Sequence, residues 1–423
     1  MKEIHPLSSV DTAIVVPGSK SLTQRALIAA ALADGTSRLL GPLASEDTEY
    51  TSQALVQMGI RVERENPACW LVHGNGGRLQ VPEQEVFLGN NGTATRFLTS
   101  VAALVPGAVV IDGEERMRER PIGPLMQALK GWGVDIFSIL GTDCPPLRIG
   151  GGGLSGGETV LPEGRSSQYL SSLLLVAPYA TTPARLRVEG EVLSKPYVSM
   201  TLSVMADFGI EVDCDSQLND FVIPQGSYRA MEYEIEGDAS NASYFWAAAA
   251  ITGGRVTVSN VPVPSLQGDA GLVPLLARMG CDISREGGGI TVRGPKRLEG
   301  IRVDMGDMPD VVPTLAVVAA FAQGQTRIDN IAHLRIKECD RLTATLTELS
   351  KMGVRVEEGP DFMIIHGDGG KGLHGAEIET YRDHRMAMSF AVAGLRVPGV
   401  RILNESCVAK SFPDFWERFA LLG

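Results

Sequence analysis

The sequence predicts an α/β (α+β) protein of two domains that are built from six similar units. Six short polar clusters each open an apolar stretch typical of a buried helix, and they recur at intervals of roughly 70–75 residues. The clusters occupy residues 17–25, 89–96, 163–169, 236–243, 305–312 and 381–388. Because a single core rarely grows beyond about 250–300 residues, the 423-residue chain is expected to divide into two domains of three units each.

Each unit continues in the same order. The apolar helix, such as residues 26–32 or 315–322, precedes a short strand such as residues 38–43. An amphipathic helix then ends at a glycine, which predicts a C-terminal cap, and an alternating strand typical of a half-buried sheet follows in the first five units. The glycines are Gly59, Gly133, Gly209, Gly280, Gly353 and Gly423. Two further short strands lead into the next polar cluster.

The sixth unit stops at Gly423 without its strands, whereas residues 3–7 and 12–18 at the start of the chain have the pattern of strands. We therefore expect the N-terminal strands to complete the sixth unit and to pack with the C-terminal helix in one domain. The expected domains are residues 1–18 plus 232–423, and residues 19–231 as an inserted domain. Ligands commonly bind between two such domains, so the active site is expected in an interdomain cleft.

Composition excludes several classes of function. The net charge of −12 disfavours nucleic acid or an anionic membrane surface as a partner, and no apolar run is long enough to span a bilayer. The N-terminus lacks the pattern of a secretory signal, and the six cysteines are scattered, which favours the reducing cytoplasm. Several of the polar clusters are nevertheless basic. A locally basic centre in an acidic protein indicates small anionic substrates.

The helix openings carry the candidate chemistry, because a helix N-terminus presents unpaired N–H groups and the positive end of the helix dipole. Lys20 and Arg25 project from the first turns of a helix that Ser19 or Ser21 can cap. Gly92 permits close approach of the backbone to a ligand. Taken alone, each opening is explained as well or better by an ordinary helix cap. Their equivalent placement in the repeat is what favours a shared site.

Two charged segments add to these openings. Arg116, Arg118 and Arg120 alternate, so in an extended segment they would point to one side and could bind carboxylate or phosphate through their planar forks. The alternative is a solvated charged loop. Residues 335–342 are expected to open an amphipathic helix, and the alternative is a solvated, salt-bridged face formed by the charges of Lys337, Glu338, Asp340 and Arg341.

Two carboxylates occupy positions where a negative charge is unusual. Asp310 lies at the opening of a very apolar helix, and Glu338 lies in the basic segment 335–342. The functional interpretation of the pair is general acid and base catalysis in a site whose cations and burial tune their protonation. His384, in the sixth cluster, is more often structural than catalytic in such a setting.

Eight motifs together resemble those of a known family. In chain order they are PGSKSLTQR, LGNNGTATRFL, DGEERMRERPI, SSQYLSSLLL, LSKPY, LRIKECDRL, YRDHRMAM and AKSFPDF, and they are similar to the motifs of the EPSP synthase family, the 3-phosphoshikimate 1-carboxyvinyltransferases. The resemblance spans nearly the whole chain. It implies a two-domain inside-out α/β barrel, each domain holding three βαβαββ units with buried parallel helices. It also implies transfer of the carboxyvinyl group of phosphoenolpyruvate to the 5-hydroxyl of shikimate 3-phosphate, with release of phosphate, on the pathway to chorismate and the aromatic amino acids.

The resemblance further implies roles for individual residues. Shikimate 3-phosphate would be bound by Lys20, Ser21, Arg25, Ser166, Ser167, Gln168, Ser194, Tyr197, Asp310 and Lys337. Phosphoenolpyruvate would be bound by Lys20, Gly92, Arg120, Gln168, Arg341, Arg385 and Lys410. Asp310 would accept the proton of the 5-hydroxyl, Glu338 would protonate the methylene carbon, and Lys20 could serve either transfer. Such chemistry needs a proton donor, a proton acceptor and many cations, and no metal or cofactor is expected.

Some positions depart from the family pattern. His333 stands where asparagine is frequent, Phe97 where proline is frequent, and Arg165 where a small or apolar residue is usual. The resemblance implies competition by glyphosate at the phosphoenolpyruvate site, because Gly92 leaves room there, and Phe97 is expected to alter that sensitivity.

Two other functions compete with this one. A sister enolpyruvyl transferase acts on UDP-N-acetylglucosamine, but it carries a cysteine in the loop that corresponds to residues 114–121, and this segment has none. A non-enzymatic anion-binding protein on the same scaffold is disfavoured by the intact charged residues. The protein is expected to act as a monomer on small anions.

Overall fold

A computed structural model describes residues 1–164, 166–286 and 288–423, so Arg165, one of the departures noted above, lies outside the described residues. The chain divides into two compact units. The inserted unit comprises residues 18–235, and the discontinuous unit comprises residues 1–17 and 236–423. The sequence predicts that the chain passes from one domain to the other near residues 18 and 232. None of the helices in the described segments combines the length and apolar character that crossing a bilayer requires.

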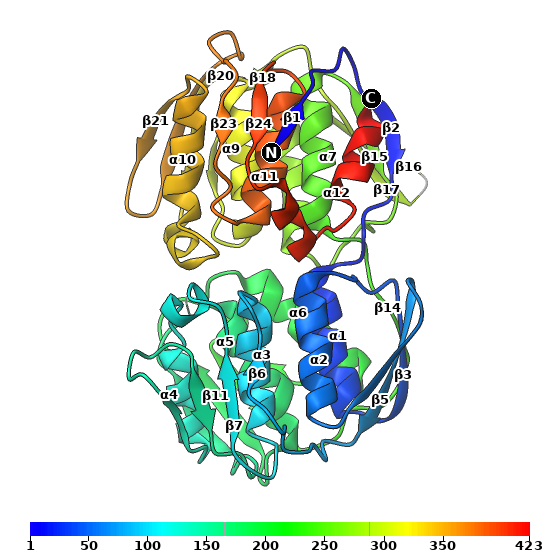
Figure 1. Cartoon of the computed structure of the whole chain (residues 1–423), viewed down its shortest axis with the longest axis vertical. Helices are drawn as coiled ribbons and strands as arrows, with labels where there is room; N and C mark the ends of the chain where they lie inside the picture. The colour runs from blue at the N-terminus through cyan, green and yellow to red at the C-terminus, as the bar shows by residue number, and fades with distance from the viewer. Residues whose placement is uncertain (165, 287) are drawn as a thin grey trace. The chain divides into compact units, whose positions relative to one another are not determined.

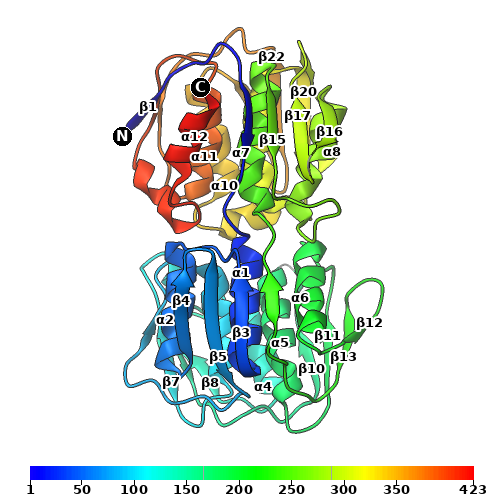
Figure 2. The same cartoon turned by 90° about the vertical axis from the view of Figure 1, so that its right-hand side faces the viewer.

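The inserted unit surrounds three parallel, buried helices with sheets. Its helices are α1 (Lys20–Leu32), α2 (Glu46–Gln57), α3 (Gly92–Ala102), α4 (Gly123–Gly131), α5 (Ser167–Val176) and α6 (Lys195–Asp207). One sheet has the strand order β14 (Glu232–Glu234), β3 (Asp34–Leu40), β5 (Cys69–Asn75), β4 (Arg61–Asn66). A second sheet has the order β6 (Val86–Phe87), β7 (Val109–Asp112), β9 (Leu147–Ile149), β8 (Ile136–Ser138). The third has the order β10 (Gly157–Leu161), β11 (Ala184–Val188), β13 (Asp220–Ile223), β12 (Asp213–Cys214). Helices α1, α3 and α5 form the centre, and Figure 2 shows the sheet of β3, β5 and β4 beside α1.

The discontinuous unit repeats this plan around α7, α9 and α11, which stand together in Figure 1. Its helices are α7 (Ala239–Thr252), α8 (Leu272–Arg278), α9 (Val312–Ala320), α10 (Arg341–Lys351), α11 (His384–Gly394) and α12 (Phe415–Phe419). Its sheets have the orders β2 (Asp11–Ile14), β15 (Arg255–Val258), β17 (Gly289–Arg293), β16 (Asp282–Glu286); β18 (Leu298–Glu299), β20 (Ala322–Asp329), β22 (Met363–Asp368), β21 (Arg355–Glu358), with β19 (Arg302–Asp304) also on β20; and β1 (Lys2–Ile4), β24 (Val400–Ile402), β23 (Glu377–Ile378).

Strands are exchanged between the first and the fourth of the six repeats, those of α1 and α7. Elsewhere the strand before a buried helix pairs in parallel with the strand after it, as β6 does with β7 around α3. The strand before α1 is β2, but it pairs with β15 after α7, and β14 before α7 pairs with β3 after α1. The expectation that both N-terminal strands complete the sixth unit was therefore wrong for β2. Strand β1 does join the sixth unit, through β24, because it supplies the antiparallel partner that this unit lacks.

The helix types follow from the sequence patterns. Helix α9 is buried along its whole length and has no polar face, and its one polar residue, Thr314, lies in its first turn. The amphipathic helices lie outside the central three, and the first five end at the predicted glycines. The sixth was predicted to end at Gly423, but α12 ends at Phe419 and a 3₁₀ turn over Ala420–Leu422 follows it. Gly133 after α4 and Gly209 after α6 have φ of 82° and 91°, a left-handed conformation that glycine adopts without steric cost. The parallel buried helices therefore bring their polar N-terminal turns to one end of each unit.

Candidate active site

Lys20, the first residue of α1, forms a buried ion pair in the inserted unit. Its Nζ donates to Asp47 Oδ2 over 2.9 Å, and Asp47 lies in the first turn of α2. The side chain of Ser19 accepts the N–H of Leu22, so Ser19 is the cap of α1. Asn91 Nδ2 donates to the carbonyl of Asp47 over 2.6 Å, which ties this pair to the start of α3. The N-terminal ends of three helices are thereby linked.

Arg120 covers the first turn of α3. A Cβ atom added to Gly92 would lie 2.4 Å from Arg120 Nη2, so only glycine leaves room for the guanidinium in this position. Nη1 of Arg120 donates to Asn90 Oδ1 over 3.2 Å, and Arg120 is buried. The cap of α3 is Asn91, whose side chain accepts the N–H of Ala94 over 2.9 Å. Arg120 and Gly92, predicted to bind the same substrate, therefore lie in contact.

The segment that carries the three arginines is not extended, so the first of its two interpretations is wrong. Residues Met117–Glu119 form a 3₁₀ turn, which the carbonyl of Glu114 begins by accepting the N–H of Met117 over 2.8 Å. Arg118 consequently pairs with Asp112, and Arg116 Nη1 pairs with Glu119 Oε2 over 2.9 Å. A turn does not place alternate side chains on one face, so these two arginines do not join Arg120 over α3.

Arg25 is buried and ties α1 to its neighbours. Its Nε donates to Thr201 Oγ1 over 2.7 Å, Nη1 to the carbonyl of Ser21 over 2.9 Å, and Nη2 to the carbonyl of Tyr197 over 3.0 Å. Its guanidinium also lies 5.2 Å from the ring centre of Phe97. Burial lowers the pKa of Arg25 to about 10. These contacts fix α1, α6 and α3 to one another around a single cation.

Hydroxyl and amide side chains complete this end of the inserted unit. Gln168 Nε2 donates to Thr93 Oγ1 over 3.1 Å, which joins α5 to α3. Ser166 precedes α5 and Ser194 precedes α6, yet neither side chain caps its helix. Ser194 has the left-handed φ of 56°, unusual for serine. The simple interpretation of these serines as caps is therefore not supported.

Arg341 is the centre of the charged cluster in the discontinuous unit. Its side chain is 1% exposed, and it contacts three carboxylates. Nε donates to Asp383 Oδ2 over 2.7 Å, Nη1 to Asp310 Oδ1 over 2.9 Å and Nη2 to Glu338 Oε2 over 2.8 Å. Burial alone would lower the pKa of Arg341, but the three carboxylates outweigh it and raise this pKa well above its usual value.

Arg385 holds Asp310 from the other side. Its Nη2 donates to Asp310 Oδ2 over 2.8 Å, and its Nη1 donates to Tyr244 Oη over 3.2 Å. Both oxygens of Asp310 thus accept from a buried guanidinium. Asp383 caps α11 by accepting the N–H of Arg385 over 2.9 Å. Lys410 completes the cluster, with Nζ 3.8 Å from Glu338 Oε1.

The helix expected over residues 335–342 begins later than its charge pattern indicated. Asp340 is the cap of α10 and accepts the N–H of Thr343 over 3.1 Å, so Arg341 is the first helical residue. Aspartate is a strong N-cap, and this preference outweighs the charge periodicity of the segment. Lys337 therefore lies before the helix, half-buried, and does not share a helix face with Arg341.

The predicted site residues divide into two groups. The inserted unit holds Lys20, Ser21, Arg25, Gly92, Arg120, Ser166, Ser167, Gln168, Ser194 and Tyr197. The discontinuous unit holds Asp310, Lys337, Glu338, Arg341, Arg385 and Lys410. Sequence reasoning missed the roles of Asp47, Asp383 and Tyr244 as partners of these side chains. Their one visible signal was an acidic or aromatic residue close to a buried helix start.

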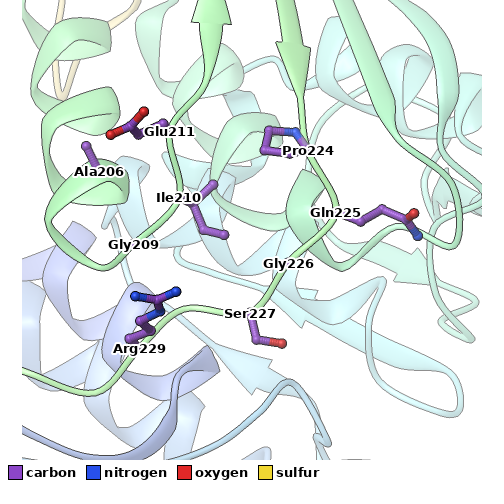
Figure 3. A pocket seen from close by; sticks show the side chains of 9 residues that line it. All are labelled: Ala206, Gly209, Ile210, Glu211, Pro224, Gln225, Gly226, Ser227 and Arg229. Carbon is purple, nitrogen blue, oxygen red and sulfur yellow. The ribbon is translucent and has the colours of Figure 1, made fainter.

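Two surface hollows lie away from both groups. One, of about 550 Å³, lies beside α6 and includes Glu211, Gln225 and Arg229 (Figure 3). The other, of about 530 Å³, lies beside the C-terminal end of α7 and includes Lys296 and Arg396. The first carries charges of both signs, and at the second the helix presents carbonyl groups, the negative end of its dipole. Neither hollow includes a residue of the predicted site.

Comparison with known proteins agrees with these motifs. The sequence model of the family described as EPSP synthase (3-phosphoshikimate 1-carboxyvinyltransferase) matches residues 4–419. The chain belongs to the EPSP synthase family. A relative from Nostoc punctiforme, named 3-phosphoshikimate 1-carboxyvinyltransferase, is 45% identical over 413 residues, which cover 97% of this chain and 96% of the relative. A protein of the same name from Syntrophobacter fumaroxidans is 44% identical and covers 100% of this chain and 99% of its own.

Solved structures agree with the EPSP synthase fold. The EPSP synthase from Acinetobacter baumannii superimposes with a TM-score of 0.84 at 30% sequence identity, covering 100% of this chain and 98% of that one. The family resemblance inferred from the motifs is therefore confirmed, and so is the predicted two-domain α/β fold.

Proposed function

We propose that this chain transfers the carboxyvinyl group of phosphoenolpyruvate to the 5-hydroxyl of shikimate 3-phosphate, giving 5-enolpyruvylshikimate 3-phosphate and phosphate. The observation that carries the proposal is Asp310 held between the guanidinium groups of Arg341 and Arg385, with Glu338 on the same Arg341. Two carboxylates on one cationic frame supply the proton acceptor and donor that the reaction needs. Family membership along nearly the whole chain supports the substrate assignment.

The proposed reaction proceeds by addition and elimination. Glu338 protonates the methylene carbon of phosphoenolpyruvate, which makes the neighbouring carbon electrophilic, and the 5-hydroxyl oxygen attacks that carbon while its proton passes to Asp310. The product is a tetrahedral intermediate that carries the phosphate. Elimination then removes a proton from the new methyl group and expels phosphate, which restores the double bond. Lys20 could serve either proton transfer.

The two groups of residues have complementary tasks in this proposal. Phosphoenolpyruvate brings a carboxylate and a phosphate, for which we propose Lys20, Gly92, Arg120, Gln168, Arg341, Arg385 and Lys410. Shikimate 3-phosphate brings hydroxyls, a carboxylate and a phosphate, for which we propose Lys20, Ser21, Arg25, Ser166, Ser167, Gln168, Ser194, Tyr197, Asp310 and Lys337. Positioned cations and hydrogen-bond donors would supply most of the rate acceleration, because they need little reorganisation during the reaction.

A phosphate-release assay tests the proposal directly. The purified chain is incubated with phosphoenolpyruvate and either shikimate 3-phosphate or UDP-N-acetylglucosamine. Release of phosphate with shikimate 3-phosphate alone is expected. Release with the nucleotide sugar would favour the sister enolpyruvyl transferase, which the absence of a cysteine in residues 114–121 disfavours. Tight binding of either substrate without turnover would favour an anion-binding protein.

We also infer that the protein works as a monomer in the cytoplasm. All six cysteines lie in described segments and are free thiols, which suits a reducing compartment. Light scattering on the protein as it elutes from a size-exclusion column measures its mass, and 45.1 kDa is the expected value for one chain.

A further inference from the structure

The turn before α11 has an unusual backbone. Tyr381 and Arg382 have φ of 54° and 56°, and among the described residues they are the only adjacent non-glycine residues with positive φ. Side chains with a Cβ rarely adopt this left-handed conformation, and a buried or functional contact is the usual reason that it persists. Asp383 follows directly and Arg385 lies two residues further on, and both belong to the charged cluster.

A carboxylate on α10 holds this turn from inside. Glu348 is fully buried, and its Oε1 accepts the Tyr381 hydroxyl over 2.7 Å while its Oε2 accepts the N–H of Glu379 over 3.0 Å. Lys351, one turn further along α10, balances the charge with Nζ 2.8 Å from Oε2. The ring of Tyr381 reaches the surface, whereas its hydroxyl points to Glu348. Desolvation, then the bond to Glu348, raises the pKa of Tyr381, so the phenol stays a proton donor at neutral pH.

Helix α10 therefore contacts the turn at two places. Arg341 at its first residue binds Asp383. Glu348, two helical turns later on the same face, binds Glu379 just before the left-handed pair and Tyr381 within it. Between the two contacts the chain also folds on itself, because the N–H of Asp383 donates to the carbonyl of Thr380 over 2.8 Å. A shift of this turn would move Asp383 and the start of α11 together, and Arg385 with them.

We propose that Glu348 and Tyr381 are positioning residues. Their hydrogen bond holds residues 379–382 in the left-handed turn and thereby aims Arg385 at Asp310 and at the phosphoenolpyruvate that Arg385 would bind. We call the hydrogen bond between Tyr381 and Glu348 the latch. The proposal rests on the function proposed above, because it links the latch to the binding of phosphoenolpyruvate by Arg385. Both carboxylate oxygens of the buried Glu348 accept hydrogen bonds from the strained turn. If Glu348 only filled space in the core, a nonpolar side chain would do so with a smaller desolvation penalty, and we therefore assign Glu348 to holding the turn.

The first test is Tyr381→Phe in the full chain, which removes the donor and keeps the ring. Steady-state phosphate release should show a KM for phosphoenolpyruvate raised about tenfold, in keeping with loss of a hydrogen bond to a charged group. The KM for shikimate 3-phosphate should change far less. Tyr228→Phe is the matched control, because it also removes a buried phenol hydrogen bond, to the carbonyl of Leu175, within the inserted unit. This control should lower thermal stability without raising the KM for phosphoenolpyruvate.

The second test is rescue through the backbone. Asparagine adopts the left-handed conformation more readily than arginine, so Arg382→Asn should cost little by itself and should restore most of the affinity lost in Tyr381→Phe. A purely structural tyrosine would give no such rescue. An unchanged KM in Tyr381→Phe, or a double variant as weak as the single one, would overturn the latch.

Hydrogen exchange separates the latch from the chemistry. The amides of Glu379 and Asp383 should exchange faster in Tyr381→Phe and recover protection in the double variant with Arg382→Asn, whether or not the protein turns over these substrates. Equal protection in the wild type and Tyr381→Phe would overturn the latch. An inactive wild type whose Tyr381→Phe variant loses protection would instead sink the proposed function and keep the latch.

Discussion

The two groups of site residues handle charge differently. In the inserted unit, Lys20 contacts the carboxylate of Asp47, while Arg25 and Arg120 contact mainly carbonyl and amide oxygens. In the discontinuous unit, three cations meet three carboxylates in one connected cluster. The first arrangement leaves an excess of positive charge at the helix N-termini, where anions bind readily. In the second, these cations and carboxylates are equal in number, and both guanidinium groups are already paired with a carboxylate.

The largest effect is expected from neutralising the carboxylates of the balanced cluster. Asp310→Asn and Glu338→Gln keep the shape of each side chain but remove its proton chemistry, so each should lower kcat by about 10²–10⁴-fold. Substrate dissociation constants, measured by calorimetry, should change far less than kcat. Near-normal turnover in either variant would remove that residue from the mechanism.

The next effect compares the stability of the two groups. Asp383→Asn takes one of three carboxylates from the buried Arg341 and should lower the free energy of unfolding by about 3 kcal/mol, as expected when a buried ion pair is broken. Asp47→Asn removes the carboxylate that Lys20 contacts at the start of α1, where the helix end also offers backbone partners, and should cost less, about 1–2 kcal/mol. Urea unfolding of both variants at pH 7 provides the comparison. A larger loss from Asp47→Asn would contradict the contrast between the groups.

Much of this architecture could be predicted from the sequence. The polar openings before apolar runs located the starts of the buried helices, and glycines such as Gly133 located the ends of the amphipathic ones. Both signals are local, because capping and backbone conformation depend on neighbouring residues. The exchange of β2 and β14 could not be predicted in this way. Each is a short edge strand, and its partner is chosen by packing against residues more than 190 positions away.

The site was predictable in part for the same reason. Residues at helix starts, such as Lys20 and Gly92, stand in recognisable motifs, whereas Asp47 and Glu348 lie in ordinary amphipathic helices. Their importance arises from contacts with Lys20 and Tyr381, 27 and 33 residues away along the chain. No periodicity reports such a pairing. The interpretation of Arg118 as an anion-binding neighbour of Arg120 is wrong for a local reason, because a 3₁₀ turn takes the place of an extended backbone there.

A smaller effect concerns His333, which is buried beside the balanced cluster. Neither of its ring nitrogens has a hydrogen-bond partner among the described residues. Burial, and then the charge of Lys337, lower its pKa to about 3, although Asp310 opposes this shift. The folded protein thus keeps His333 neutral, while the unfolded chain protonates it near pH 6.5. The stability that neutral His333 allows is present above pH 6.5 and is lost as the pH falls towards 3.

The substitution His333→Asn should remove this dependence. Below pH 6.5 the wild type should lose up to about 1.4 kcal/mol per pH unit more than the variant, because the unfolded state binds one proton that the folded state excludes. Urea unfolding of both proteins between pH 7 and pH 5 measures the difference. Parallel pH profiles would mean that water or a neighbouring group accommodates the charged ring.

The smallest expected effect on catalysis tests the positive group at Gly92. The Cβ of Gly92→Ala would lie 2.4 Å from Arg120 Nη2, the far end of a flexible side chain, so the guanidinium should shift and the helix should stay in place. Phosphoenolpyruvate should then bind less than about tenfold more weakly, since Lys20 remains on the adjacent helix. Glyphosate, expected to compete for this space, should lose more affinity because it is longer and meets the new methyl group. Inhibition constants for glyphosate in the wild type and variant decide the matter. An unchanged constant would mean that the inhibitor does not approach the start of α3.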